Sequence, residues 1–170
     1  HGRGAAIGAS LSNILAAAGF DVAREFYVND AGRQMDILTL STWLRYLGLN
    51  HVHIPFPANA YQGEYVKNMA QLIFQAHADR YVHQPAMLLD GLPESAHTAA
   101  TDTDEQLDKL IANAKKILGQ DYAYLHNFVL TEQLGDCRND LMEFGVEFDT
   151  WFSEQSLFDN GQVAHTMQLL

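Results

Sequence analysis

The sequence is poor in the residues that build disulfide-rich, fibrous and disordered proteins. It has one cysteine, Cys137, which excludes a disulfide within the chain and a zinc site made of several cysteines. Only 4 prolines and 12 glycines occur, and no apolar run approaches the roughly 20 residues that a membrane-spanning helix needs. With 48% hydrophobic residues the chain suits a globular fold, and we expect a cytoplasmic protein without a membrane partner.

Positive charge is also scarce. Ten lysines and arginines stand against 21 aspartates and glutamates, which gives a formal net charge of -11 at pH 7. The averaged surface therefore repels phosphate backbones, and any contact with a nucleic acid has to come from a local basic patch.

Helix and strand signals alternate in the first third of the chain. The small and apolar residues of Ala5–Ala18 predict a helix, and the aromatic and β-branched run Phe20–Val28 predicts a strand. After the loop Asn29–Gly32 we expect a buried helix that ends at Gly48. This order predicts an α/β fold with a parallel sheet. No strand precedes His1, so we expect a trimmed piece of a longer protein.

The rest of the chain is mainly helical until a late strand. Pro55 begins a break, and Thr103 has the capping-box spacing ahead of an amphipathic helix that Gly119 should end. A further helix up to Phe144, with a possible break at Gly135, leads to an alternating strand at residues 146–152 and a last helix.

The first four residues, His1, Gly2, Arg3 and Gly4, stand where the first helix begins. A helix N-terminus offers free backbone N–H groups and a partial positive charge, so a phosphate is stabilised there. The histidine and the arginine add donors that can stabilise charge on a phosphate. The same residues also suit a flexible terminus whose small side chains pack a helix on a sheet.

Asn29 and Asp30, with Gln34 just beyond, follow the predicted strand. Ligands of open α/β sheets bind at the carboxyl ends of the strands, so these residues are candidates on the substrate side. They also suit an ordinary strand-to-helix turn. His51 and His53 share a strand face but lack a third ligand, so we expect no metal site. Cys137 is expected to be a structural thiol.

Four segments share their residues and their order with one protein family. They are His1–Gly8 (HGRGAAIG), Gly19–Gln34 (GFDVAREFYVNDAGRQ), Gly63–Tyr65 (GEY) and Phe144–Glu154 (FGVEFDTWFSE). Together they resemble the catalytic domain of bacterial arginyl-tRNA synthetases, class I enzymes with a Rossmann-type fold. His1 matches the second histidine of the family's His-x-Gly-His motif, which helps to hold the phosphates of ATP.

The resemblance implies a reaction, its substrates and a division of the chain. ATP with Mg²⁺ would activate L-arginine as arginyl-adenylate, and the arginyl group would pass to tRNA(Arg), without a tightly bound metal or organic cofactor. Residues 1–54 would be an incomplete first Rossmann half, 55–135 a mainly helical connective insertion near the acceptor arm, and 136–170 the return to the catalytic α/β domain. Lys67, Lys115 and Lys116 are then candidates for tRNA contact, and we expect a monomer.

Departures from the family leave two alternatives open. Ala9 stands where the family usually has aspartate, and the second signature loop with its lysine is absent, so we expect no activity from this piece alone. One alternative is a catalytically silent paralogue or interaction module with the same fold. The other is a different class I nucleotidyltransferase.

Overall fold

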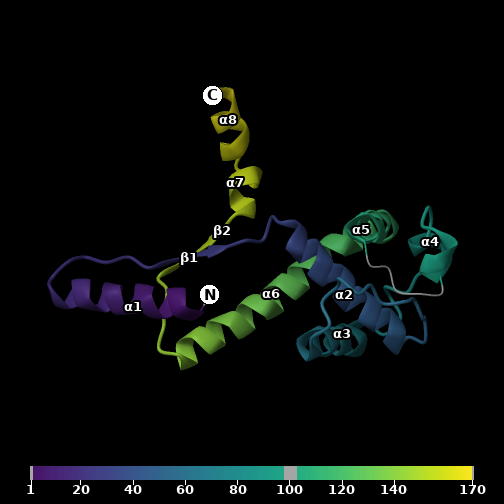
Figure 1. Cartoon of the computed structure of the whole chain (residues 1–170), viewed down its shortest axis with the longest axis horizontal. Helices are drawn as coiled ribbons and strands as arrows, with labels where there is room; N and C mark the ends of the chain where they lie inside the picture. The colour runs from purple at the N-terminus through teal and green to yellow at the C-terminus, as the bar shows by residue number, and fades with distance from the viewer. Residues whose placement is uncertain (1, 98–102, 170) are drawn as a thin grey trace. The chain divides into compact units, whose positions relative to one another are not determined.

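A computed structural model of the chain describes residues 2–97 and 103–169 (Figure 1). His1, the residue on which the sequence analysis placed most chemistry, lies outside the described residues. The elements in chain order are α1 (Gly2–Ala17), β1 (Glu25–Val28), α2 (Arg33–Leu49), α3 (Glu64–His77), α4 (Pro85–Leu88), the 3₁₀ helix η1 (Glu94–His97), α5 (Asp104–Leu118), α6 (Gln120–Glu143), β2 (Thr150–Ser153), α7 (Gln155–Asp159) and α8 (Gln162–Leu169). No described helix is both long and apolar enough to cross a bilayer.

The chain divides into two compact units. Residues 1–31 and 133–170 form the first, which we call the strand unit, and residues 32–132 form the second, the helical unit. Helix α2 therefore belongs to the helical unit and not to the strand unit. From the sequence we had grouped it with residues 1–54. Whether the helical unit is an insertion in a larger catalytic fold stays a prediction.

The strand unit contains the described sheet, which consists of the parallel pair β1 and β2. Glu25 pairs with Thr150 and Val28 with Ser153, so four residues of each strand are in register. The predicted strands are thus confirmed in place and wrong in length, because residues 20–24 and 146–149 lie outside the ladder. Asp21 and Ala23 are poor strand formers, and the ladder begins only at Glu25, opposite Thr150.

The first predicted helix is confirmed as α1, with bounds of Gly2–Ala17 in place of the expected Ala5–Ala18. Its large apolar residues are not buried, however: Ile7, Leu11 and Ile14 are 70%, 55% and 66% exposed. The small residues at four-residue spacing, Gly4 and Gly8 among them, lie on the side of the helix that faces β1. The helix thus turns its smallest side chains to the strand, and its branched ones outward.

The helical unit has the main apolar core, centred on α2. Most residues of α2 are buried, and the helix runs between α3 and α5, both of which it contacts (Figure 1). Trp43 donates its indole N–H to the carbonyl of Tyr81 at 2.9 Å, and the Tyr46 hydroxyl donates to the carbonyl of Ala78 at 2.6 Å. These two bonds satisfy the polar ends of large buried side chains, so the rings can fill the core without an unpaired group.

Of the glycines expected to end a helix, Gly119 does so, and Gly48 and Gly135 do not. Thr103 caps α5 by accepting the backbone N–H of Gln106, and Gly119 ends the helix with a φ of 54°, both as predicted. The expected end at Gly48 is wrong, since α2 continues to Leu49 and Asn50 caps it. A break at Gly135 is wrong as well, because α6 is continuous through it. An interior glycine costs a helix about 1 kcal/mol, which packing can offset.

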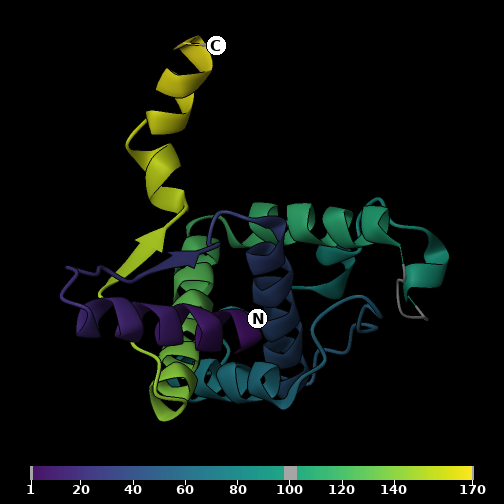
Figure 2. The same cartoon turned by 60° about the vertical axis from the view of Figure 1, so that its left-hand side comes forward.

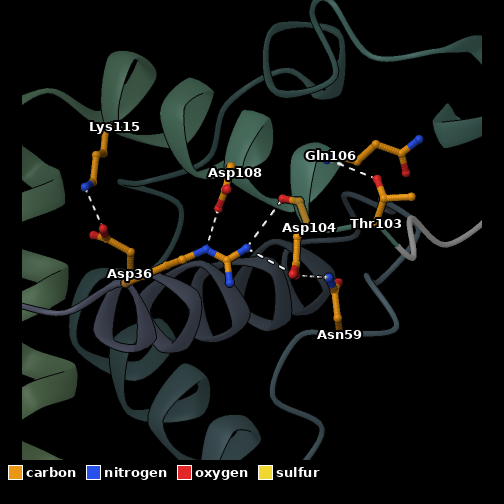
Figure 3. Close-up of polar contacts among 8 residues, drawn as sticks. Asp36, Asn59, Thr103, Asp104, Gln106, Asp108 and Lys115 are labelled. Carbon is orange, nitrogen blue, oxygen red and sulfur yellow. Dashed lines mark hydrogen bonds and ion pairs between the residues drawn. The ribbon is translucent and has the colours of Figure 1, made fainter.

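A polar network joins α2 to α5 and α6 within the helical unit. Asp36 accepts a hydrogen bond from Lys115 Nζ at 2.7 Å (Figure 3). It also accepts one from the Tyr122 hydroxyl at 2.8 Å. Burial, and then the hydrogen bond to Asp36, raise the pKa of Tyr122, so its phenol stays a proton donor. Arg33 at the start of α2 pairs with Asp104 and Asp108 of α5.

We expect Tyr122→Phe to destabilise the helical unit by about 1–2 kcal/mol, because it removes a charge-assisted hydrogen bond from a buried position. Urea unfolding followed by the fluorescence of Trp43, which is buried in the same unit, measures the change. Tyr124→Phe is the matched control: its hydroxyl contacts His77, but its side chain is 44% exposed, so the loss should be smaller. Equal losses would contradict the role given to Asp36.

Candidate functional site

The N-terminus of α1 is open on its outer side. Gly2, Arg3 and Gly4 are exposed and form the first turn, whose backbone N–H groups have no partner further back in the helix. A Cβ added at Gly2 or Gly4 would meet no atom within 4 Å. An anion could therefore come close to this backbone, as the sequence analysis expected, although His1 itself is outside the described residues.

A pocket of about 980 Å³ lies in the strand unit beside this helix. Small residues of α1 form one wall, β1 forms another, and the end of α6 with the segment 146–148 closes the third. Gly2, Gly4 and Asn29 all line it, so the structure brings together two of the predicted phosphate-side residues and one of the predicted substrate-side residues. In Figure 2, α1 runs alongside the strand pair.

Asp30 is buried and bridges the ends of the two strands. Its carboxylate accepts the Ser153 hydroxyl at 2.6 Å and the backbone N–H of Gln155 at 2.8 Å, and it is 7% exposed. Ser153 in turn accepts the backbone N–H of Ser156, so the polar groups cap the start of α7. This geometry favours the structural alternative for Asp30 over a direct contact with substrate.

Gln34 lies in the helical unit, whereas Asn29 and Asp30 lie in the strand unit. Its side-chain oxygen accepts the hydroxyl of Tyr61 at 2.8 Å. The contact holds the start of α2 to the segment before α3, so Gln34 has a packing role whatever else it does.

The three lysines proposed for tRNA contact are all exposed. Lys67 pairs with Glu64 at 2.7 Å, and Lys115 pairs with Asp36. Lys116 forms no ion pair with any described residue. Of the three, Lys116 is thus the one whose charge is not already engaged by the protein.

Some residues of the strand unit gave no signal in the sequence. Arg24 lines the pocket, donates from Nη2 to Asn13 at 2.9 Å, and has a buried Nε without a hydrogen-bond partner in the described chain. Burial and Asp140 raise the pKa of the Cys137 thiol, in keeping with the unreactive thiol that was predicted. Partial desolvation and Glu154 raise the pKa of Tyr27. Unlike Cys137, neither Arg24 nor Tyr27 stands in a spacing that sequence reasoning could use.

No group of three or more metal-ligating side chains occurs in residues 2–97 and 103–169. His51 is exposed and has a φ of 62°, which places it in the turn after α2 and not on a strand with His53. The strand face that would have aligned the two rings is therefore absent.

The fold and the pocket define an α/β protein with a parallel strand pair and a large helical unit. A crystal structure from Campylobacter jejuni, assigned as an arginyl-tRNA synthetase, superposes on it with a TM-score of 0.56 at 24% identity, over 94% of this chain and 28% of that chain. This similarity concerns the fold alone.

The sequence comparisons go further. Arginine–tRNA ligases of Nitrosospira multiformis and Nitrosomonas eutropha are 71% and 68% identical to this chain over its whole length, and that of Legionella pneumophila is 48% identical. The chain spans 29% of the length of each of these relatives. A scan against family models gave no match. The chain is therefore related along its entire length to one segment of the arginine–tRNA ligases, which confirms the resemblance found in the sequence.

We expect Asp30→Asn to lower the stability of the strand unit by about 1–3 kcal/mol, because an amide can replace only part of a buried carboxylate's accepted bonds. Trp151, which stacks on Phe26 across the strand pair, gives the fluorescence signal for urea unfolding. Asn29→Ala, at the exposed neighbour, should change stability by less than about 0.5 kcal/mol. A stable Asp30→Asn variant would return Asp30 to the substrate-side candidates.

Proposed function

We propose that this chain forms part of the catalytic domain of an arginine–tRNA ligase. In the proposed reaction the carboxylate of L-arginine attacks the α-phosphorus of ATP, which is bound with Mg²⁺, and pyrophosphate leaves. A hydroxyl at the 3′ end of tRNA(Arg) then takes the arginyl group from the adenylate, and AMP leaves. A monomer in the cytoplasm belongs to the same proposal.

One observation carries the proposal, namely 71% identity to a named arginine–tRNA ligase along all 170 residues. The identity extends through both units, so it is not confined to a common nucleotide-binding motif. Because the chain spans 29% of that relative, the whole reaction also needs residues outside this sequence.

The geometry of the strand unit supports a phosphate-binding role for the first turn of α1. Gly2 and Gly4 leave the backbone accessible, and Arg3 is an exposed cation at the same turn. By resemblance His1 stands next to them and would stabilise charge on the phosphates of ATP. The pocket that opens beside Gly2 and Gly4 would then receive the nucleotide.

We also propose that the parallel pair β1 and β2, with α1, is part of a Rossmann-type sheet of the class I synthetases. The supporting observations are the parallel pairing and the helix beside it. The helical unit has no strand among its described residues, in keeping with a mainly helical insertion.

A catalytically silent relative is the second candidate, and Ala9 is the residue that favours it. Ala9 lines the pocket of the strand unit at the position where the family usually has aspartate. If that carboxylate were essential for chemistry, this protein would bind its substrates without joining them.

Aminoacylation of tRNA(Arg) with radiolabelled arginine by the full-length protein tests the proposal directly. We expect charging that requires ATP, and none from the 170-residue chain alone, because the missing residues complete the site. Substrate binding by the full-length protein without charging would favour the silent relative. Charging of another amino acid would contradict the assignment.

His1→Ala in the full-length protein should raise the activation free energy by about 2–4 kcal/mol and so lower kcat. The KM for arginine should change less. The reason is that a donor aimed at developing phosphate charge acts mainly in the transition state. Arg3→Ala serves as the comparison at the same turn. Turnover of His1→Ala within twofold of the unmodified protein would show that His1 is only structural.

A further inference from the structure

A pocket of about 520 Å³ lies in the helical unit, away from any residue that the proposed chemistry uses. The C-terminal half of α2, the segment 52–56 and the first half of α3 form its walls. Its volume falls within the roughly 300–1,000 Å³ of pockets that hold small molecules. The apolar part of its lining consists of Leu44, Leu49, Val52, Ile54, Phe56 and Ala70.

Arg45 is held in a fixed position at this pocket. Its guanidinium carbon lies 3.8 Å from the ring centroid of Phe56, so the planar group stacks on the aromatic face. Nη2 donates to the side-chain oxygen of Gln62 at 3.3 Å, and the Gln62 amide donates to the carbonyl of Pro57 at 3.1 Å. The stacking and the amide therefore orient the guanidinium before any ligand arrives.

The donors of Arg45 are mostly unused. No carboxylate of the described chain forms an ion pair with it. Its Nε is buried and lacks a hydrogen-bond partner among the described residues. An arginine has five N–H donors, and the one described hydrogen bond of Arg45 comes from Nη2. The buried Nε cannot reach a ligand, so it is the Nη groups that can donate to an anionic acceptor.

The rim of the pocket adds polar groups of the right kind. Lys67 is a second cation, and its pairing with Glu64 is solvent-exposed on both sides, so it can be exchanged at little cost. The amides of Asn68 and Gln71 also line the pocket and have no hydrogen-bond partner in the described chain. His53 completes the rim. Glu64 lines the pocket as well, and Lys67 is the cation that pairs with it. The site thus combines two cations, one paired carboxylate and amide donors with an apolar floor.

We propose that this pocket binds one nucleotide of an RNA strand, with its phosphate on Arg45 and its ribose or base against the apolar floor. The partner rests on the proposed function, in which the protein takes a tRNA. A stacked guanidinium with free donors suits a phosphate oxygen, and amide groups suit the edge of a base. We choose an RNA nucleotide over an acidic peptide because the proposed function already supplies an RNA partner.

Binding of a tRNA(Arg) transcript to the full-length protein, measured across a series of salt concentrations, tests the pocket. Arg45→Gln should weaken tRNA binding about tenfold at low salt, because one charge-assisted contact is lost. The slope of log affinity against log salt should fall by about 0.7–0.9, the value for one lost phosphate contact. Affinity for ATP should be unchanged, since ATP belongs to the strand unit in the proposed function.

A second variant avoids the packing of Arg45 altogether. Asn68→Asp adds a carboxylate at an exposed position of the rim, and we expect it to weaken tRNA binding about fivefold through repulsion of the phosphate. Gln75→Glu adds the same charge to the same helix outside the pocket, and Arg80→Gln removes an arginine that is paired with Asp121. Both controls should bind tRNA as the unmodified protein does.

Three results would overturn the inference: unchanged tRNA affinity in both pocket variants, a loss with an unchanged salt slope, or an equal loss in the controls. A loss of ATP affinity in place of tRNA affinity would assign the pocket to a free nucleotide and would also overturn it. Aminoacylation by the unmodified protein is measured separately. A protein that charges no arginine, yet binds tRNA through Arg45, would refute the proposed function and leave the inference intact.

Discussion

The parallel pairing of β1 with β2 is the constraint on which the strand unit depends. Two four-residue strands form a marginal sheet by themselves, so their ends need further fixing. At one end the backbone N–H of Arg24 donates to the Asp149 carboxylate at 2.7 Å, and the Asp149 N–H donates back to the Arg24 carbonyl. At the other end Asp30 binds Ser153 and Gln155. Side chains at both ends thus fix the register.

Parallel strands cannot be joined by a short turn, and the chain between this pair is long. It leaves after Val28 and returns before Thr150, and the residues between include the whole helical unit. That unit has its own core around Trp43 and Tyr46, so it does not rely on the two strands for burial of its apolar residues. The sequence predicted an insertion at residues 55–135, and whether this unit of residues 32–132 is such an insertion stays a prediction.

The sequence predicted those elements whose signals are local. Thr103 and Gly119 mark the ends of α5 because a cap and a left-handed residue act within a few positions of themselves. The predictions at Gly48 and Gly135 were wrong, because a glycine ends a helix only where the backbone that follows it also turns. After α2 the residue with left-handed backbone is His51. The length of β1 was misjudged since it depends on a partner strand 125 residues away.

The candidate site was predictable in part, for the same reason. Gly2 and Gly4 could be placed at a helix start from composition, and the structure puts them in one pocket with Asn29. The bridging role of Asp30 could not be predicted from the sequence. The groups that donate to its carboxylate, in Ser153 and Gln155, lie far along the chain. The position of Arg45 was equally hidden, since it is set by an aromatic ring and an amide on the following segment.

The proposed RNA contact depends on how the few cations of this acidic chain are paired. In the helical unit, the carboxylates neutralise Arg33, Lys67, Arg80 and Lys115 in ion pairs, so these cations add little to the field around the molecule. Arg45 differs from them, because its contacts are with an aromatic ring and an amide and not with a carboxylate. Its full charge therefore remains directed at whatever enters the pocket. A net charge of -11 then repels RNA from most of the surface and makes such a position more selective.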